Sequence, residues 1–97
     1  MNTTEHLLTC LAEECAELQQ AISKALRFGL HDRYPGSNTT NAQDIAKESI
    51  DVLAVIDILQ EQGIISKPRG TKAMVDAKRN RLNKYMKYAK TTGALVG

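Results

Sequence analysis

Two clusters of Gly, Pro and Asn divide this chain into three segments, each with the apolar periodicity of a helix. The clusters span residues 29–41 (GLHDRYPGSNTTN) and 63–70 (GIISKPRG). The spacing predicts three helices, over residues 4–28, 41–62 and 71–90. Thr3 or Thr4 is the expected N-cap of the first helix, and no segment alternates as a strand does. The expected fold class is therefore all-α.

The middle segment is apolar on more than one face. Its main apolar face is formed by Ile45, Val52, Val55, Ile56 and Leu59. Ile50 and Leu53 lie outside that face, so the helix must be covered on several sides. We therefore expect a single domain over residues 1–97, with a bundle of about three main helices per chain completed by homo-oligomerisation, as a dimer or tetramer.

Cysteine usage and hydropathy exclude several classes of protein. Cys10 and Cys15 lie in one helical segment with no CxxC motif, which favours reduced thiols in a cytoplasmic protein over a disulfide or zinc framework. No run approaches the roughly 18 apolar residues of a membrane span, and the start of the chain does not resemble a signal peptide. We expect a cytoplasmic protein.

Charge is distributed unevenly along the chain. Residues 1–62 hold 10 acidic and 4 basic residues, a net charge of −6, and residues 63–97 hold 1 acidic and 9 basic residues, a net charge of +8. The sum is the overall net charge of +2. Such an asymmetry is compatible with a nucleic-acid binder or with the two halves of a site for metal and phosphate.

Carboxylates occupy positions where a helix should be apolar. Glu14 and Glu17 lie at the edge of the apolar stripe of the first segment, and Glu48 lies within the main apolar face of the second, with Asp51 three residues on. No cation follows any of these glutamates by four residues, so helix stability does not explain them. If the two helices pack antiparallel, the two i,i+3 pairs converge, which suits a hard divalent cation such as Mg²⁺ or Mn²⁺.

The stretches LAEECAELQQAISK and KESIDVLAVIDIL resemble the EExxE and ExxD signature of MazG-like, all-α nucleoside triphosphate pyrophosphohydrolases, which are related to the dimeric dUTPases. This resemblance implies that Glu14, Glu17, Glu48 and Asp51 hold Mg²⁺ and that Glu13 positions or deprotonates the attacking water. On this interpretation Glu13 and Glu14 are the catalytic residues. The gap between Glu17 and Glu48 is long for the family, which makes the loop over residues 29–41 a candidate substrate lid.

The last segment carries basic residues, and its stretch KRNRLNKYMKYAK is similar to the final helix of that family. Lys78 intrudes on its apolar stripe and Arg81 lies at the edge. The resemblance implies that these two side chains bind the substrate's phosphates. Pairing with one of the intruding carboxylates is the alternative.

The resemblance implies an enzyme that cleaves a nucleoside triphosphate to the monophosphate and pyrophosphate, in nucleotide-pool housecleaning. Two alternatives stay open, namely a small basic helical module that binds nucleic acid and a metal-binding relative without catalysis. Ferritin-like di-iron sites are disfavoured because no ExxH motif is present, and P-loop and Rossmann phosphate sites are excluded by the absence of their glycine motifs.

Overall fold

The computed structural model describes residues 1–97 and contains three helices and no strand, which confirms the all-α class. The helices are α1 (Thr3–Phe28), α2 (Asn41–Glu61) and α3 (Thr71–Thr92). The chain divides into two compact units, Met1–Ser66 and Lys67–Gly97, and each is described by itself. The single domain expected over residues 1–97 stays a prediction. No helix carries an apolar stretch long enough to cross a bilayer.

Both helices of the first unit begin with a capping box. Asn2 accepts a hydrogen bond from the Glu5 amide, and the Glu5 carboxylate accepts one from the Asn2 amide. The expectation that Thr3 or Thr4 caps α1 is therefore wrong, because the Asn side chain reaches the third amide of the helix. Thr40 and Gln43 form the corresponding box at the start of α2. These caps fix where the two helices begin.

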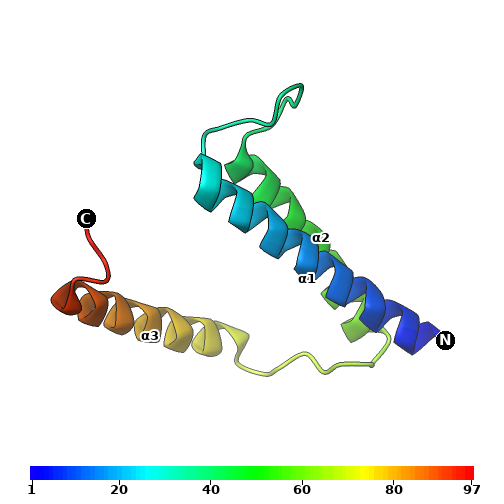
Figure 1. Cartoon of the computed structure of the whole chain (residues 1–97). Coiled ribbons are helices and arrows are strands. Elements are labelled where there is room, and N and C mark those ends of the chain that lie inside the picture. Colours follow the sequence, from blue (N-terminus) through cyan, green and yellow to red (C-terminus); the bar gives the residue numbers. More distant parts are fainter. The chain divides into compact units, whose positions relative to one another are not determined.

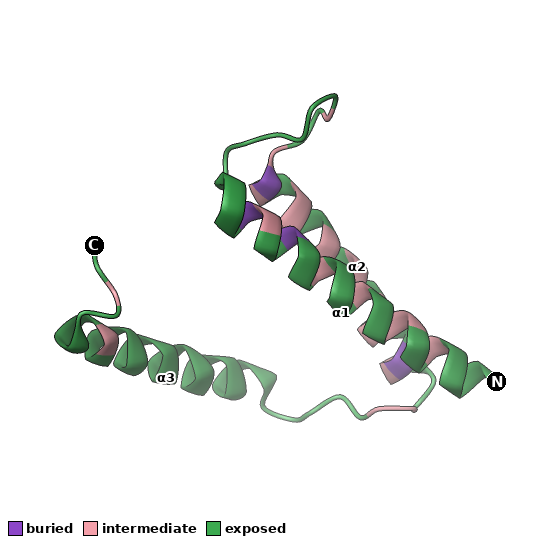
Figure 2. Ribbon diagram, viewed as in Figure 1, coloured by how far each residue is buried: buried purple, intermediate pink, exposed green.

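The first unit is a hairpin in which α1 and α2 lie side by side and run antiparallel (Figure 1). Its buried apolar residues are only Ala21, Ala25 and Leu59. Figure 2 marks the few buried positions of the hairpin in purple. Cys15 and Ile22, which belong to the expected apolar stripe of α1, are exposed. The core of this unit is therefore thin.

Large apolar side chains remain exposed on both helices of the hairpin. Ile50 and Leu53 on α2 are 65% and 61% exposed, and Leu26 on α1 is 82% exposed. This exposure is what the sequence predicts for a helix that needs covering on several sides. The homo-oligomer that would cover it stays a prediction.

The second unit consists of α3 and its flanking segments. The helix begins after Gly70 and ends before Gly93, both in the left-handed conformation that glycine adopts without strain. No residue of α3 is buried. Its large apolar residues, among them Leu82 and Tyr85, are exposed, and so are its basic residues.

Candidate metal centre

The antiparallel hairpin brings carboxylates from both helices together. Glu14 and Glu17 lie one turn apart on α1, and Glu48 lies on α2. One carboxylate oxygen from each of the three lies within 4.8 Å of the others. Glu14 and Glu48 are half-buried and Glu17 is exposed. The convergence that the i,i+3 spacing predicts therefore occurs for these three residues, which we call the acidic cluster.

Two oxygens of the acidic cluster have no partner. Oε2 of Glu14 and Oε2 of Glu48 are both inaccessible to solvent and accept no hydrogen bond. Buried carboxylate oxygens are normally hydrogen-bonded or bound to a cation, because desolvating them is costly. These two atoms, each on a member of the acidic cluster, are thus buried without a hydrogen bond from the protein.

The acidic cluster perturbs the titration of Glu14. Desolvation raises the pKa of this carboxyl above its usual range, and the negative charges of Glu17, Asp51 and Glu48 raise it further. The ammonium of Lys47 opposes this effect and lowers the pKa of Glu14. The charged form of Glu14 is therefore disfavoured in the protein alone, and a cation at the cluster would favour it.

Lys47 is not among the residues that the sequence singles out, and its ammonium lies beside the acids of α2. Its Nζ lies 2.9 Å from Oδ2 of Asp51 and 3.5 Å from Oε1 of Glu48. The expectation that these acids have no cationic partner on their own helix is therefore wrong for α2. Lys47 precedes Asp51 by four residues and pairs with it, although no cation follows Glu48 by four residues. The hydrogen bond to Asp51 raises the pKa of Lys47, although this ammonium is 68% exposed and such a pair contributes little stability.

Asp51 stands apart from the other expected metal ligands. Its carboxylate is engaged by Lys47 and is not among the three whose oxygens lie within 4.8 Å of one another. It nevertheless lies close enough to raise the pKa of Glu14. Asp51 is thus at the margin of the acidic cluster, and its role as a ligand stays a prediction.

The remaining expected site residues lie outside the acidic cluster. Glu13 is exposed on α1, next to Glu14 in sequence. Lys78 and Arg81 are exposed on α3, in the second unit. Their roles as the base and as phosphate ligands stay predictions.

A cavity of about 390 Å³ opens beside the acidic cluster, between α1 and α2. Its lining includes Glu17, Gln20, Lys24, Asn41, Asp44 and Glu48. The carboxylates of Glu17, Asp44 and Glu48 line this cavity together with the ammonium of Lys24, so the cavity suits a ligand with both a cation and an anionic group. We call it the acidic cavity.

Hydrogen bonds from the start of α2 hold the end of the acidic cavity in place. The amide nitrogen Nδ2 of Asn41, which is 4% exposed, donates to the carbonyl oxygen of Gly29 at 2.8 Å. Oγ1 of Thr39 donates to Oδ1 of Asp44 at 2.6 Å. The first of these bonds joins the end of α1 to the start of α2.

Sequence reasoning missed Lys24 and Asn41 as well as Lys47. Lys24 follows Glu17 by seven residues, about two helical turns, so a search along that face of the first helix would have found it. In the sequence Asn41 belongs to a polar cluster of residues. It becomes buried only because the loop folds back and brings Asn41 against the end of α1.

No family model, no curated protein and no solved structure matches this chain. The MazG-like interpretation therefore depends on the short acidic motifs and on the geometry described above.

Proposed function

We propose that this chain is a Mg²⁺-dependent nucleoside triphosphate pyrophosphohydrolase, with Mn²⁺ as an alternative metal. The observation that carries the proposal is the pair of buried, unpartnered oxygens on Glu14 and Glu48, which come from two helices into one group of three carboxylates. Hard divalent cations prefer such oxygen donors and keep several waters. The resemblance to the EExxE and ExxD motifs supports the same assignment.

The metal would be held by Glu14, Glu17 and Glu48. Asp51 would become a further ligand if its carboxylate left the ion pair with Lys47 and bound the metal. The bound ion would neutralise phosphate charge and make a water a better nucleophile at neutral pH. The metal would then lie beside the acidic cavity, which Glu17 and Glu48 line.

The reaction is attack of a water oxygen on the α-phosphorus, with cleavage of the bond from that phosphorus to the oxygen bridging the α and β phosphates. Glu13 takes the proton from the attacking water, and pyrophosphate leaves with the bond's electron pair. Lys24, in the acidic cavity, stabilises negative charge on the phosphates. The products are a nucleoside monophosphate and pyrophosphate, as a pool-housecleaning enzyme requires.

The test is pyrophosphate release from a panel of canonical and modified NTPs and dNTPs with Mg²⁺, with Mn²⁺ and with EDTA. We expect metal-dependent formation of nucleoside monophosphate and pyrophosphate, and its loss in Glu48→Gln. Glu61→Gln is the matched control, because Glu61 is an exposed glutamate at the end of the same helix. Nucleoside diphosphate and phosphate as products, or turnover that survives Glu48→Gln, would refute the proposal. Metal binding without turnover would favour a non-catalytic relative.

The charge of the second unit favours one other function. Lys67–Gly97 holds nine basic residues and one acid, and nearly every side chain of α3 is exposed. This unit would then bind nucleic acid through phosphate contacts, with an affinity that falls steeply as salt increases. A titration of the full chain with single- and double-stranded oligonucleotides at several salt concentrations tests it, and salt-independent or absent binding rejects it.

A further inference from the structure

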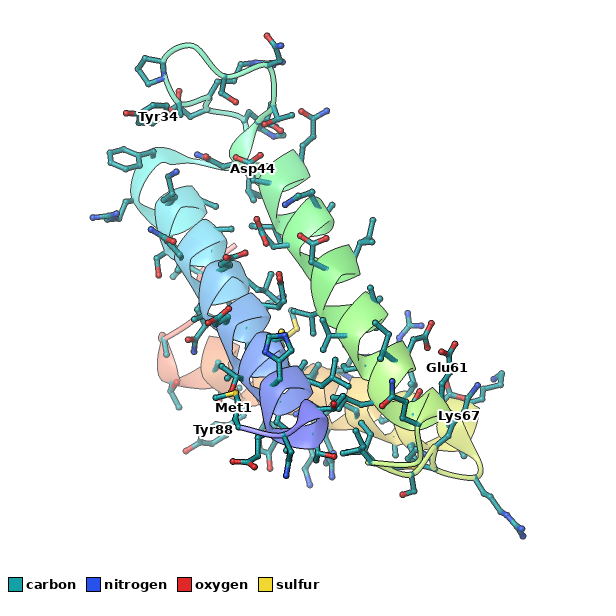
Figure 3. The ribbon with its side chains drawn as sticks, turned by 90° about the vertical axis from the view of Figure 1, so that its right-hand side faces the viewer. Met1, Tyr34, Asp44, Glu61, Lys67 and Tyr88 are labelled. Atoms are coloured by element: carbon teal, nitrogen blue, oxygen red, sulfur yellow. The ribbon has the colours of Figure 1, made fainter.

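A second cavity of about 390 Å³ lies where α1 ends and the loop to α2 begins. Its lining includes Lys24, Phe28, Asp32, Arg33, Tyr34 and Asn41. We call it the aromatic cavity. Figure 3 shows Tyr34 on the loop at the end of the hairpin where Asp44 also lies. The function proposed above does not use this cavity.

The acidic and aromatic cavities are consecutive. Lys24 and Asn41 line both of them. A ligand that extends from the acidic cluster along α1 would therefore pass Lys24 and enter the aromatic cavity. Its anionic part would lie beside Lys24, and its other end would lie between the last turn of α1 and the loop.

The two aromatic residues of this cavity are accessible to a ligand. Phe28 is 60% exposed and Tyr34 is 67% exposed, although both belong to a unit with few aromatic residues. Exposed aromatic rings beside cations are the usual platform for stacking a nucleobase. Nζ of Lys24 lies over the Tyr34 ring, 5.3 Å from its centre, so this cation covers one face of the ring and a base would stack on the other face.

The loop that carries Tyr34 is held by hydrogen bonds. The backbone amides of Asn41 and Ala42 donate to the carbonyls of Asp32 and Leu30, each at 2.9 Å. Nη1 of Arg33 donates to the carbonyl of Asn38 at 2.6 Å. The cavity is thus formed before any ligand enters, which lowers the cost of ordering it.

We propose that the aromatic cavity binds the nucleobase of the nucleoside triphosphate, with Tyr34 and Phe28 as stacking surfaces, while Lys24 contacts the phosphates. The inference rests on the function proposed above and adds to it the part of the molecule that recognises a nucleoside. Inorganic polyphosphate, which has no base, would use only the acidic cavity.

The test measures binding of nucleoside monophosphates and of inorganic triphosphate, by calorimetry on the full chain, without and with Mg²⁺. Tyr34→Ala should weaken nucleoside monophosphate binding by about 5- to 150-fold, the range expected for losing one stacked base, and leave triphosphate binding unchanged. Tyr34→Phe, which keeps the ring, should bind like the unaltered protein. Tyr88→Ala is the matched control, since Tyr88 is 68% exposed and lies on α3.

The outcomes separate this inference from the proposed function. If the protein hydrolyses nucleoside triphosphates but Tyr34→Ala and Phe28→Ala leave KM and nucleotide affinity unchanged, the aromatic cavity is not the base site. If nucleoside monophosphates bind in a way that depends on Tyr34 while no nucleotide is hydrolysed, the base site stands and the catalytic proposal fails. If the unaltered protein binds no nucleoside monophosphate at millimolar concentration, the inference is overturned.

Discussion

Removing the ammonium of Lys47 should strengthen metal binding. In the structure this side chain neutralises Asp51 and Glu48, with Nζ–oxygen distances of 2.9 and 3.5 Å. A divalent cation at the acidic cluster would meet repulsion from this ammonium and would compete with it for the carboxylates. Lys47→Gln removes both effects and keeps a side chain of similar length on the helix.

The expected size follows from Coulomb's law. A Mg²⁺–oxygen distance of about 2.1 Å, added to the contacts of Lys47, puts the ammonium roughly 5 Å from the ion. A double charge and a single charge at about 5 Å repel by roughly 1.5 kcal/mol in water. Screening at physiological salt reduces this to about 1 kcal/mol, which corresponds to a Kd about fivefold lower for the variant. The lost ion pair itself contributes about 0.2 to 1 kcal/mol of folding stability, because Lys47 is exposed.

The assay is calorimetric titration of the metal-free protein with Mg²⁺ and with Mn²⁺ at 0.05 and 0.5 M salt. The matched control is Lys72→Gln, because Lys72 pairs with Asp76 at 3.0 Å in the same i,i+4 arrangement on α3. We expect tighter binding in Lys47→Gln, a smaller gain at high salt, and no change in Lys72→Gln. Unchanged or weaker binding in Lys47→Gln would refute the argument that the metal and Lys47 share these carboxylates.

Three further predictions concern stability and pH. Leu59→Ala should lower the free energy of unfolding, measured by urea titration, by about 2 to 5 kcal/mol, because Leu59 is the one fully buried large side chain. A loss below about 1 kcal/mol would show that the packing of Leu59 is not the source of stability. Asn41→Ala should cost about 1 to 3 kcal/mol by the same measurement, since it removes a buried donor from the Gly29 carbonyl, and an unchanged midpoint would contradict this. Because the pKa of Glu14 is raised, the folded metal-free protein binds more protons than the unfolded chain, and its stability should fall as pH rises from about 4 through that raised pKa. Glu14→Gln should remove this decrease, and an identical pH profile in the variant would refute it.

Local sequence signals are sufficient to predict the number of helices and where they end. The Gly-rich clusters and the apolar spacing gave ends within two residues of those observed at α2 and α3. Asn2 caps α1 in place of the expected Thr3 or Thr4, because only Asn2 has a glutamate three residues on, Glu5, to complete the capping box. The convergence of Glu14, Glu17 and Glu48 was also predictable, because i,i+3 spacing on two antiparallel helices leaves few other arrangements.

Features that depend on how the loop between α1 and α2 folds back could not be predicted from the sequence. The buried position of Asn41 and the placement of Tyr34 near Lys24 both require the loop to fold back on the end of α1. Lys47 is a different case, because it precedes Asp51 by four residues on one helix and this pairing is readable from the sequence. The cover for Ile50 and Leu53 depends on contacts beyond a single hairpin.

The central claim is that the acidic cluster binds a divalent cation, and Mn²⁺ binding followed by electron paramagnetic resonance tests it most directly. The unaltered protein should bind Mn²⁺ at the cluster, Mg²⁺ should displace it, and Glu48→Gln should lose the site while Glu61→Gln retains it. Circular dichroism would confirm that both variants stay helical. Equal Mn²⁺ affinity in the unaltered protein and in Glu48→Gln would contradict the claim.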